Sequence, residues 1–222
     1  MSNKVIKQSV ILITVVAVIA IGLLIGFKHH KKSSATPISR SPLRINTANQ
    51  PTLGNPNAKV KIVAFEDLKC MMCKLFNIGL YPKIKKDYVA TGKASYSVIN
   101  LAFIPGSMNA AVTARCLFDQ NPPYFFKFVD YIYHHQGAEN ENWTTVSNML
   151  SDASKIPGVD IVRLGVCVST SAHASLIRDN LKYARKIMGS TVRTPSIYVN
   201  GILVSPLTME RFKQIYDLAA SS

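Results

Sequence analysis

Cysteine is scarce in this chain, and its four copies are unevenly spaced. Cys70 and Cys73 form one C-x-x-C pair, whereas Cys116 and Cys167 stand alone. A four-cysteine zinc site needs a second such pair, so its absence argues against one, although a mixed zinc site at the pair stays open. A plain disulfide within the pair also stays open, but closing so short a loop contributes little chain entropy.

Acidic residues are also scarce, and repeats are absent. The chain has 12 Asp and Glu against 26 Lys and Arg, which gives a formal net charge of +14. The basic residues are dispersed and no nucleic-acid recognition motif accompanies them, so we expect no nucleic-acid partner. The positive charge favours an anionic bilayer and acidic substrates instead. The lack of any internal repeat or low-complexity tract excludes repeat architectures.

The C-x-x-C pair lies between an expected buried strand at residues 60–65 and an expected helix at 74–88. Three-residue spacing in the first turn of a helix brings two sulfurs within bonding range. Free N–H groups and the positive end of the helix dipole stabilise a thiolate there. We therefore expect Cys70 to be an exposed nucleophile of low pKa and Cys73 the resolving thiol, with Lys69 adding a nearby cation. This arrangement predicts thiol–disulfide exchange.

The expected helix at 74–88 has a recognisable apolar side. The residues predicted to face the core are Leu75, Ile78, Leu80, Ile84 and Tyr88, while the lysines face water. Pro82 is predicted to kink the helix, because its ring removes a backbone donor.

Only one long uncharged run occurs, at residues 10–27. As a helix it is about 27 Å long, enough to cross a hydrocarbon core. We predict a cytoplasmic head at 1–9, a transmembrane anchor or uncleaved signal at 10–27, and a basic flank with a flexible tether at 28–56. Disulfide chemistry would place the rest of the chain in the periplasm, anchored to the inner membrane. Cleavage near Ser33 would instead release a soluble periplasmic protein.

The rest of the chain alternates expected strands and helices, in the order β-α-β, a helical block, then β-β-α. Asn200-Gly201 splits the last strand run and predicts a hairpin turn. Asn142 or Thr144 is the expected cap of one helix, and Thr208 of the last. The remaining elements are a strand at 94–101, helices at 107–119, 124–134, 144–153 and 172–188, a hairpin at 196–204, and a helix at 208–218.

Two motifs carry a family resemblance. Residues 65–73 read Phe-Glu-Asp-Leu-Lys-Cys-Met-Met-Cys, and residues 193–201 read Arg-Thr-Pro-Ser-Ile-Tyr-Val-Asn-Gly. Together they resemble the DsbA-like branch of the thioredoxin-fold disulfide oxidoreductases. The Met-Met dipeptide beside an anchor most resembles the envelope proteins of the DsbH type. The resemblance implies an α/β thioredoxin fold over 57–222, with a helical insert at about 107–190.

The resemblance also implies roles for single residues. Cys70 matches the attacking cysteine and Cys73 the resolving one. Pro195 matches a proline that follows a cis peptide bond beside the disulfide, and Thr194 offers backbone groups to a substrate chain. The family's buried acid, six residues before the first cysteine, is replaced here by Ala64. Glu66 lies on the same strand face and is a candidate for handling the resolving thiol's proton; the alternative is a solvated acid at a strand end.

The direction of the reaction depends on the residues between the cysteines. Met71 and Met72 supply neither charge nor a good donor to stabilise the Cys70 thiolate. We therefore expect a moderately reducing couple that reduces or exchanges disulfides. Two alternatives remain open: a DsbA-type oxidase that forms disulfides, and a chaperone for soft metal ions that uses the cysteines and nearby methionines.

Cys116 and Cys167 each lie among apolar residues, so they are either two buried free thiols or a structural disulfide. The histidines show no ligand spacing, and we expect neither a metal site nor a cofactor. The expected partners are substrate proteins with disulfides or thiols, and a membrane redox partner that resets the cysteine pair.

Overall fold

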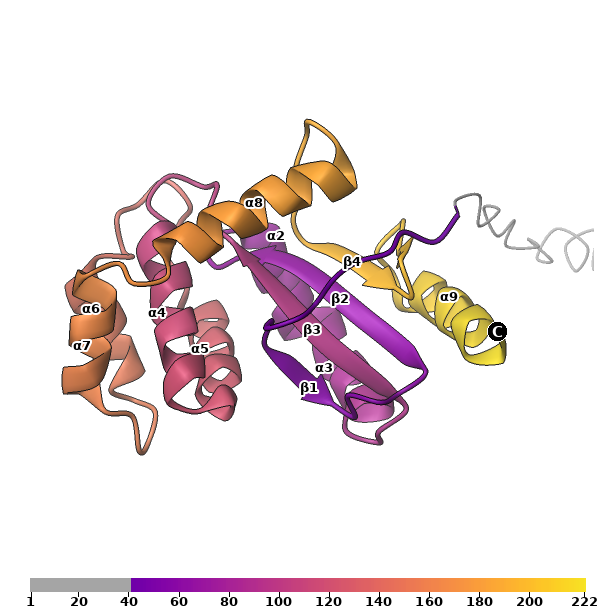
Figure 1. The fold of residues 1–222 in the computed structure, drawn as a ribbon, viewed down its shortest axis with the longest axis horizontal. Helices are drawn as coiled ribbons and strands as arrows, with labels where there is room; N and C mark the ends of the chain where they lie inside the picture. Colours follow the sequence, from indigo (N-terminus) through magenta and orange to yellow (C-terminus); the bar gives the residue numbers. More distant parts are fainter. Residues whose placement is uncertain (1–40) are drawn as a thin grey trace, which may run out of the picture. The chain divides into compact units, whose positions relative to one another are not determined.

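The computed structural model describes residues 41–222 (Figure 1). The predicted head at 1–9, the anchor at 10–27 and the first part of the tether lie outside these residues. Within the part described, no helix is both long and apolar enough to cross a membrane. The predicted anchor therefore stays a prediction.

A five-stranded sheet forms the centre of the domain, with strand order β1-β3-β2-β4-β5. The central strand β2 pairs parallel with β3 and antiparallel with β4. Almost every residue of β2 and β3 is buried, as expected of paired parallel strands covered on both faces, and this includes the polar residues Ser95, Ser97 and Asn100 of β3. The strands are β1 (Thr52–Gly54), β2 (Val60–Asp67), β3 (Ala94–Leu101), β4 (Ser196–Val199) and β5 (Ile202–Leu203).

The strand β1 corrects the predicted tether. Its three residues pair antiparallel with β3 and extend the sheet at that edge. Just before β1, the Leu43 N–H donates to the Gly201 carbonyl at 3.0 Å. The tether predicted at 28–56 therefore reaches too far into the domain. Backbone pairing holds this segment, and three residues are too few to show the apolar alternation of a strand.

A helical segment runs from the cysteine pair to residue 89 and changes type three times. It consists of α2 (Met71–Leu75), a π-helical turn (Phe76–Leu80), α3 (Tyr81–Ile84) and a second π-helical turn (Lys85–Val89). The wide turns rotate later residues relative to a regular helix. Leu75 and Ile78 are 51% and 42% exposed, while Phe76 and Asn77 are buried. The predicted core side is therefore wrong at Leu75 and Ile78, whereas Ile84 is buried and Tyr88 packs against Phe212.

The helical insert contains the four predicted helices and one that was not predicted. Thr145 caps α6 in place of the predicted Asn142 or Thr144, by accepting from the Asn148 N–H. The additional helix α7 is capped by Asp160, which accepts from the Arg163 N–H. The helices are α4 (Met108–Gln120), α5 (Pro122–His135), α6 (Val146–Ala153), α7 (Ile161–Ser169) and α8 (Ala174–Met188).

The last insert helix, α8, returns across one face of the sheet (Figure 1). Its Ala184 is buried against a cluster that includes Phe65 of β2 and Leu101 of β3. The C-terminal helix α9 (Met209–Ser221) begins at the predicted cap Thr208 and packs Phe212 against Tyr88. The predicted order β-α-β, helical block, β-β-α is confirmed.

The hairpin between β4 and β5 turns at Asn200-Gly201, as predicted. Both residues have positive φ, at 44° and 81°, which a two-residue hairpin turn of this kind requires.

Candidate active site

Asp67 organises the turn that carries the cysteine pair. Its carboxylate is fully buried at the end of β2 and accepts from the Lys69 N–H at 2.9 Å. The other oxygen accepts from the backbone N–H groups of Phe103 and Ile104, and from the Ser107 hydroxyl. Burial raises the pKa of Asp67, while these hydrogen bonds oppose that rise. Sequence reasoning missed this residue, because its donors come from a loop 36 to 40 positions away.

Cys70 caps α2 and faces the loop before β4. Its backbone is extended there, and its Sγ lies 3.5 Å from the Thr194 carbonyl. The residue is only 6% exposed, so the predicted exposed nucleophile is in fact largely covered. Cys73 is completely buried behind it, and both cysteines are free thiols in this structure.

The surroundings of Cys70 favour its thiolate. Its pKa is lowered to about 6, first by a hydrogen bond from the Cys73 thiol and further by the Thr194 side chain and the N–H groups of Cys73 and Met72; burial opposes the shift. The Thr194 hydroxyl is buried and has no other partner in this dithiol form, so it is free to donate to a thiolate. The donors of the helix amino end thus act as predicted.

The surroundings of Cys73 act in the opposite direction. Burial raises its pKa well above the usual value, and the hydrogen bond to the Cys70 thiolate and the charge of Glu66 raise it further. Cys70 therefore ionises before Cys73. This is the order expected of an attacking and a resolving cysteine.

Glu66 is buried beneath the cysteine pair, not solvated. Tyr96 and Tyr133 each donate a hydroxyl hydrogen bond to its carboxylate at 2.8 Å, and the Asn77 amide donates at 2.7 Å. Burial raises the pKa of Glu66 above 4.5, and the three donors oppose that rise. The alternative of a solvated acid is therefore wrong. A narrow pocket reaches this network and is lined by Lys85, among other residues.

Lys69 does not act as the cation expected beside Cys70. Its side chain is buried, and Nζ donates to the carbonyls of Pro105 and Glu141, both at 2.9 Å. The ammonium group therefore joins two loops around the site. The lowered pKa of Cys70 comes instead from Cys73, Thr194 and the Met72 N–H.

The loop after α5 closes over the start of α2. Glu139 accepts from the Met71 N–H at 2.5 Å, and the Gln136 amide donates to the Leu68 carbonyl at 2.7 Å. Sequence reasoning missed both residues, because nothing local to them indicates a contact about 68 positions away. Met72, between the cysteines, is 58% exposed.

The peptide bond between Thr194 and Pro195 is cis, as the family resemblance implies. A second cis bond, between Ser205 and Pro206, was not predicted.

Cys116 and Cys167 form a disulfide that joins α4 to α7, with their Cα atoms 6.0 Å apart. Of the two alternatives left open by the sequence, the disulfide is the one present. It lies in the insert and is separate from the Cys70 pair.

The fold and the paired cysteines define a thioredoxin-fold thiol–disulfide oxidoreductase of the DsbA-like type. The family model described as thioredoxin matches residues 46–217, so the chain belongs to that family.

Similar proteins carry related names. The chain is 30% identical over 161 residues to a probable disulfide bond formation protein D of Bacillus cereus, covering 72% of this chain and 74% of the relative. It is 30% identical over 152 residues to disulfide bond formation protein D of Bacillus subtilis, covering 68% of each. These names do not test the finer resemblance to the DsbH type, which stays a prediction.

Solved structures are similar over most of the chain. BdbD from Bacillus subtilis superposes with a TM-score of 0.75 at 25% identity, covering 82% of this chain and 98% of that one. DsbA from Chlamydia trachomatis superposes with a TM-score of 0.72 at 26% identity, covering 82% and 96%.

Proposed function

We propose that this chain forms disulfides in substrate proteins outside the cytoplasm, held at the membrane by residues 10–27. The observation that carries this proposal is the stabilised Cys70 thiolate, whose pKa is lowered to about 6. A stabilised thiolate favours the reduced form of the pair, and a couple whose reduced form is stable is an oxidant. The low pKa also makes Cys70 a good leaving group.

The reaction begins with the pair as a disulfide. A substrate thiolate attacks Cys70 Sγ, the bond between Cys70 and Cys73 breaks, and Cys73 leaves with the electron pair and takes up a proton. A second substrate thiolate then attacks the substrate sulfur of this mixed disulfide and releases the Cys70 thiolate. The substrate has lost two electrons and two protons, and the pair has gained both electrons.

A partner must then reoxidise the pair. We propose that this is the membrane redox partner expected from the sequence, and that the predicted anchor keeps the domain near it. The named relatives are disulfide bond formation proteins, which supports proteins with free thiols as substrates.

Glu66 is proposed to handle the proton of Cys73. Its carboxylate influences the Cys73 thiol electrostatically, and burial raises its pKa, which favours a proton on this carboxyl group. Thr194 and Pro195 are proposed to receive the substrate chain, because their backbone lies beside Cys70 Sγ.

Reduction or exchange of disulfides is the second candidate. Met71 and Met72 add no charge between the cysteines, and the Glu139 carboxylate at the Met71 N–H places a negative charge at the start of α2. Both features lower the stability of a thiolate relative to a site with a cation there.

The alternative of a soft-metal chaperone has less support. Within residues 41–222, the cluster of three His, Cys, Asp or Glu ligands that could hold a metal does not include the Cys70 pair.

The equilibrium redox potential of the pair separates the two directions. The full-length chain is equilibrated with glutathione buffers, and the thiol state of Cys70 and Cys73 is read by alkylation and peptide mass spectrometry. A potential near that of DsbA, about −120 mV, supports the oxidase, and one near that of thioredoxin, about −270 mV, supports the reductase. A Cys73→Ser variant that is incubated with a reduced substrate and an oxidant reports captured mixed disulfides. Stoichiometric metal in the purified protein would favour the chaperone.

A further inference from the structure

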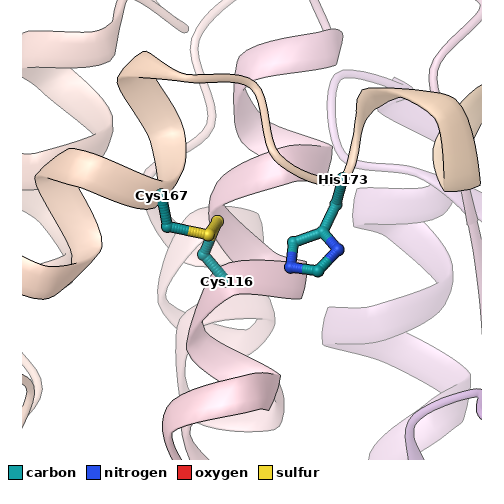
Figure 2. Close-up of side chains that lie close together, drawn as sticks. All are labelled: Cys116, Cys167 and His173. Atoms are coloured by element: carbon teal, nitrogen blue, oxygen red, sulfur yellow. A yellow bond between two sulfur atoms is a disulfide. The ribbon is translucent and has the colours of Figure 1, made fainter.

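Three potential metal ligands, none of them from the Cys70 pair, converge in the helical insert (Figure 2). Cys116 of α4, Cys167 of α7 and His173, just before α8, place their ligand atoms within 4.8 Å of one another. Figure 2 shows the imidazole ring beside the disulfide, with one ring nitrogen on the side of Cys116. This grouping could not be predicted from the sequence, because the three residues belong to separate segments of the insert.

An acidic group accompanies the histidine. Asp119 lies one turn after Cys116 on α4, and its Oδ2 is 2.7 Å from His173 Nε2. Oxygen and nitrogen ligands of one tetrahedral zinc ion lie about 3.3 Å apart, so only a small movement separates this pair from such a geometry. Arg115 also contacts the Asp119 carboxylate, with Nε 3.3 Å from Oδ1.

The charges of this group suit a divalent cation. Two thiolates and one carboxylate carry three negative charges, and the imidazole is neutral when it binds a metal. A Zn²⁺ ion together with the Arg115 guanidinium supplies three positive charges. Cys116 is buried, Cys167 and His173 are half-buried and Asp119 is exposed, and a balanced charge leaves no unpaired charge in the buried part of the site.

We propose that Cys116, Cys167, His173 and Asp119 bind Zn²⁺ when the disulfide between the two cysteines is reduced. The site has the mixed sulfur, nitrogen and oxygen ligands that zinc accepts in tetrahedral geometry. Two thiolates on one zinc ion lie about 3.8 Å apart, so the S–S bond must be broken before the metal enters. The disulfide and the metal site therefore exclude each other.

The chemistry has two balanced steps. A dithiol reductant gives two electrons and two protons to the disulfide between Cys116 and Cys167, which yields two thiols and leaves the reductant as its own disulfide. Zn²⁺ then displaces the two thiol protons and whichever proton the His173–Asp119 pair holds between them. No electrons move in this second step.

The consequence is a cross-link that survives a change of redox state. The disulfide joins α4 to α7, and the metal would join the same helices and also hold the segment that leads into α8. Because α8 packs against β3, the insert would stay fixed on the sheet in a reducing environment. Bound zinc would also keep the two thiolates from forming mixed disulfides with substrates.

The test uses the full-length chain with Cys70→Ser and Cys73→Ser, so that the active-site pair cannot bind metal. One sample keeps the second disulfide, and another is reduced with a phosphine that is removed without air. Both are titrated with Zn²⁺ by calorimetry in competition with a chelator of known affinity. Co²⁺ then replaces Zn²⁺ as an optical probe of tetrahedral geometry and thiolate ligation.

The reduced sample should bind one Zn²⁺ per chain, and the oxidised sample should lack this binding. The oxidised sample also reports any metal held by histidines elsewhere in the chain. His173→Ala in the reduced background should weaken Zn²⁺ binding at least 100-fold. His134→Ala, at an exposed histidine of α5, is the matched control and should leave the affinity unchanged.

The proposal is overturned if the reduced sample binds no more Zn²⁺ than the oxidised one, or if His173→Ala binds as tightly as its parent. Circular dichroism covers the case in which the reduced chain unfolds. Two cysteines in an unfolded chain would bind metal without any dependence on His173, and that outcome also counts against the site.

Discussion

The Tyr133 hydroxyl donates to the Glu66 carboxylate at 2.8 Å, which joins α5 of the insert to the central strand of the sheet. The hydrogen bond from Tyr133 opposes the rise that burial causes in the pKa of Glu66. The insert therefore contributes directly to the surroundings of Cys73, whose pKa the Glu66 charge raises.

Replacing this acid should slow the step in which Cys73 exchanges its proton. We expect Glu66→Gln to slow the opening of the disulfide between Cys70 and Cys73 by a substrate thiolate, the step in which Cys73 takes up its proton, by about 100-fold, the low end of what a general acid or base contributes. The pH dependence of that rate should also flatten. Stopped-flow measurement of this opening step over a series of pH values checks both effects. Asp87→Asn, at an exposed acid, is the control; equal rates in Glu66→Gln and wild type would exclude a role for Glu66.

The dithiol form should gain stability as the pH rises. The pKa of Cys70 is lowered to about 6 in the folded state, from the ordinary value of 9.0 for a free thiol. Its contribution is therefore lost as the pH falls through about 6 and fully present near pH 9. A shift of this size corresponds to at most about 4 kcal/mol. Urea unfolding of the dithiol and disulfide forms at pH 5, 7 and 8.5 should show the gain in the dithiol form alone.

The Thr194 side chain should contribute to this thiolate. Removing one hydrogen bond to a charged group costs about 1.5 kcal/mol, so Thr194→Val should raise the Cys70 pKa by about one unit. Thr194→Ser keeps the hydroxyl and should restore the wild-type value. The thiolate absorbance of Cys70 in a Cys73→Ser background, followed across pH, measures the difference between the variants. Identical titrations for Val and Ser would show that the hydroxyl is not a donor.

Lys69 should contribute to the free energy of unfolding and should not affect the pKa of Cys70. Lys69→Met removes two charge-assisted hydrogen bonds to Pro105 and Glu141, and we expect a loss of about 2 to 3 kcal/mol in the free energy of unfolding. The Cys70 pKa should stay within a few tenths of a unit of wild type. Lys86→Met, at an exposed lysine, serves as the control in both measurements. A rise of one unit in the Cys70 pKa would restore the original hypothesis that Lys69 stabilises the thiolate.

Removing the second disulfide should destabilise the domain. The bond closes a loop with a sequence separation of 51, for which the chain-entropy relation gives about 4 kcal/mol. Cys116→Ala with Cys167→Ala should lower the urea midpoint accordingly while the pKa of Cys70 is retained. Chelator is added to all samples. It prevents trace metal from cross-linking Cys116 and Cys167 in any wild-type chains whose disulfide has been reduced. An unchanged midpoint would mean that the bond contributes nothing to stability.

Features set by local sequence could be predicted, and features set by distant partners could not. The turn before α2 and the hairpin at Asn200-Gly201 each depend on residues a few positions apart, so their patterns are visible in the sequence. The strand β1 depends on pairing with β3, which no property of its own three residues indicates.

The candidate site divides in the same way. Cys70, Cys73 and Pro195 belong to short motifs with a fixed chemical meaning. Glu66 was recognised as a candidate, but its burial depends on Tyr96 and Tyr133, which are 30 and 67 positions away. The true contacts of Lys69 were missed for the same reason, because a lysine beside a cysteine in sequence need not point toward it in space.

Asp67 has a consequence for engineering this protein. One of its carboxylate oxygens holds the turn of the cysteine pair, and the other holds the Phe103–Ile104 backbone and the Ser107 hydroxyl at the start of the insert. A single side chain therefore positions both the turn that carries the cysteine pair and the loop at the start of the insert. A chimera that exchanges the insert for that of another protein must keep this loop and a hydroxyl at position 107. Otherwise Asp67 loses hydrogen bonds, and the turn that carries the cysteine pair shifts although neither cysteine has been replaced.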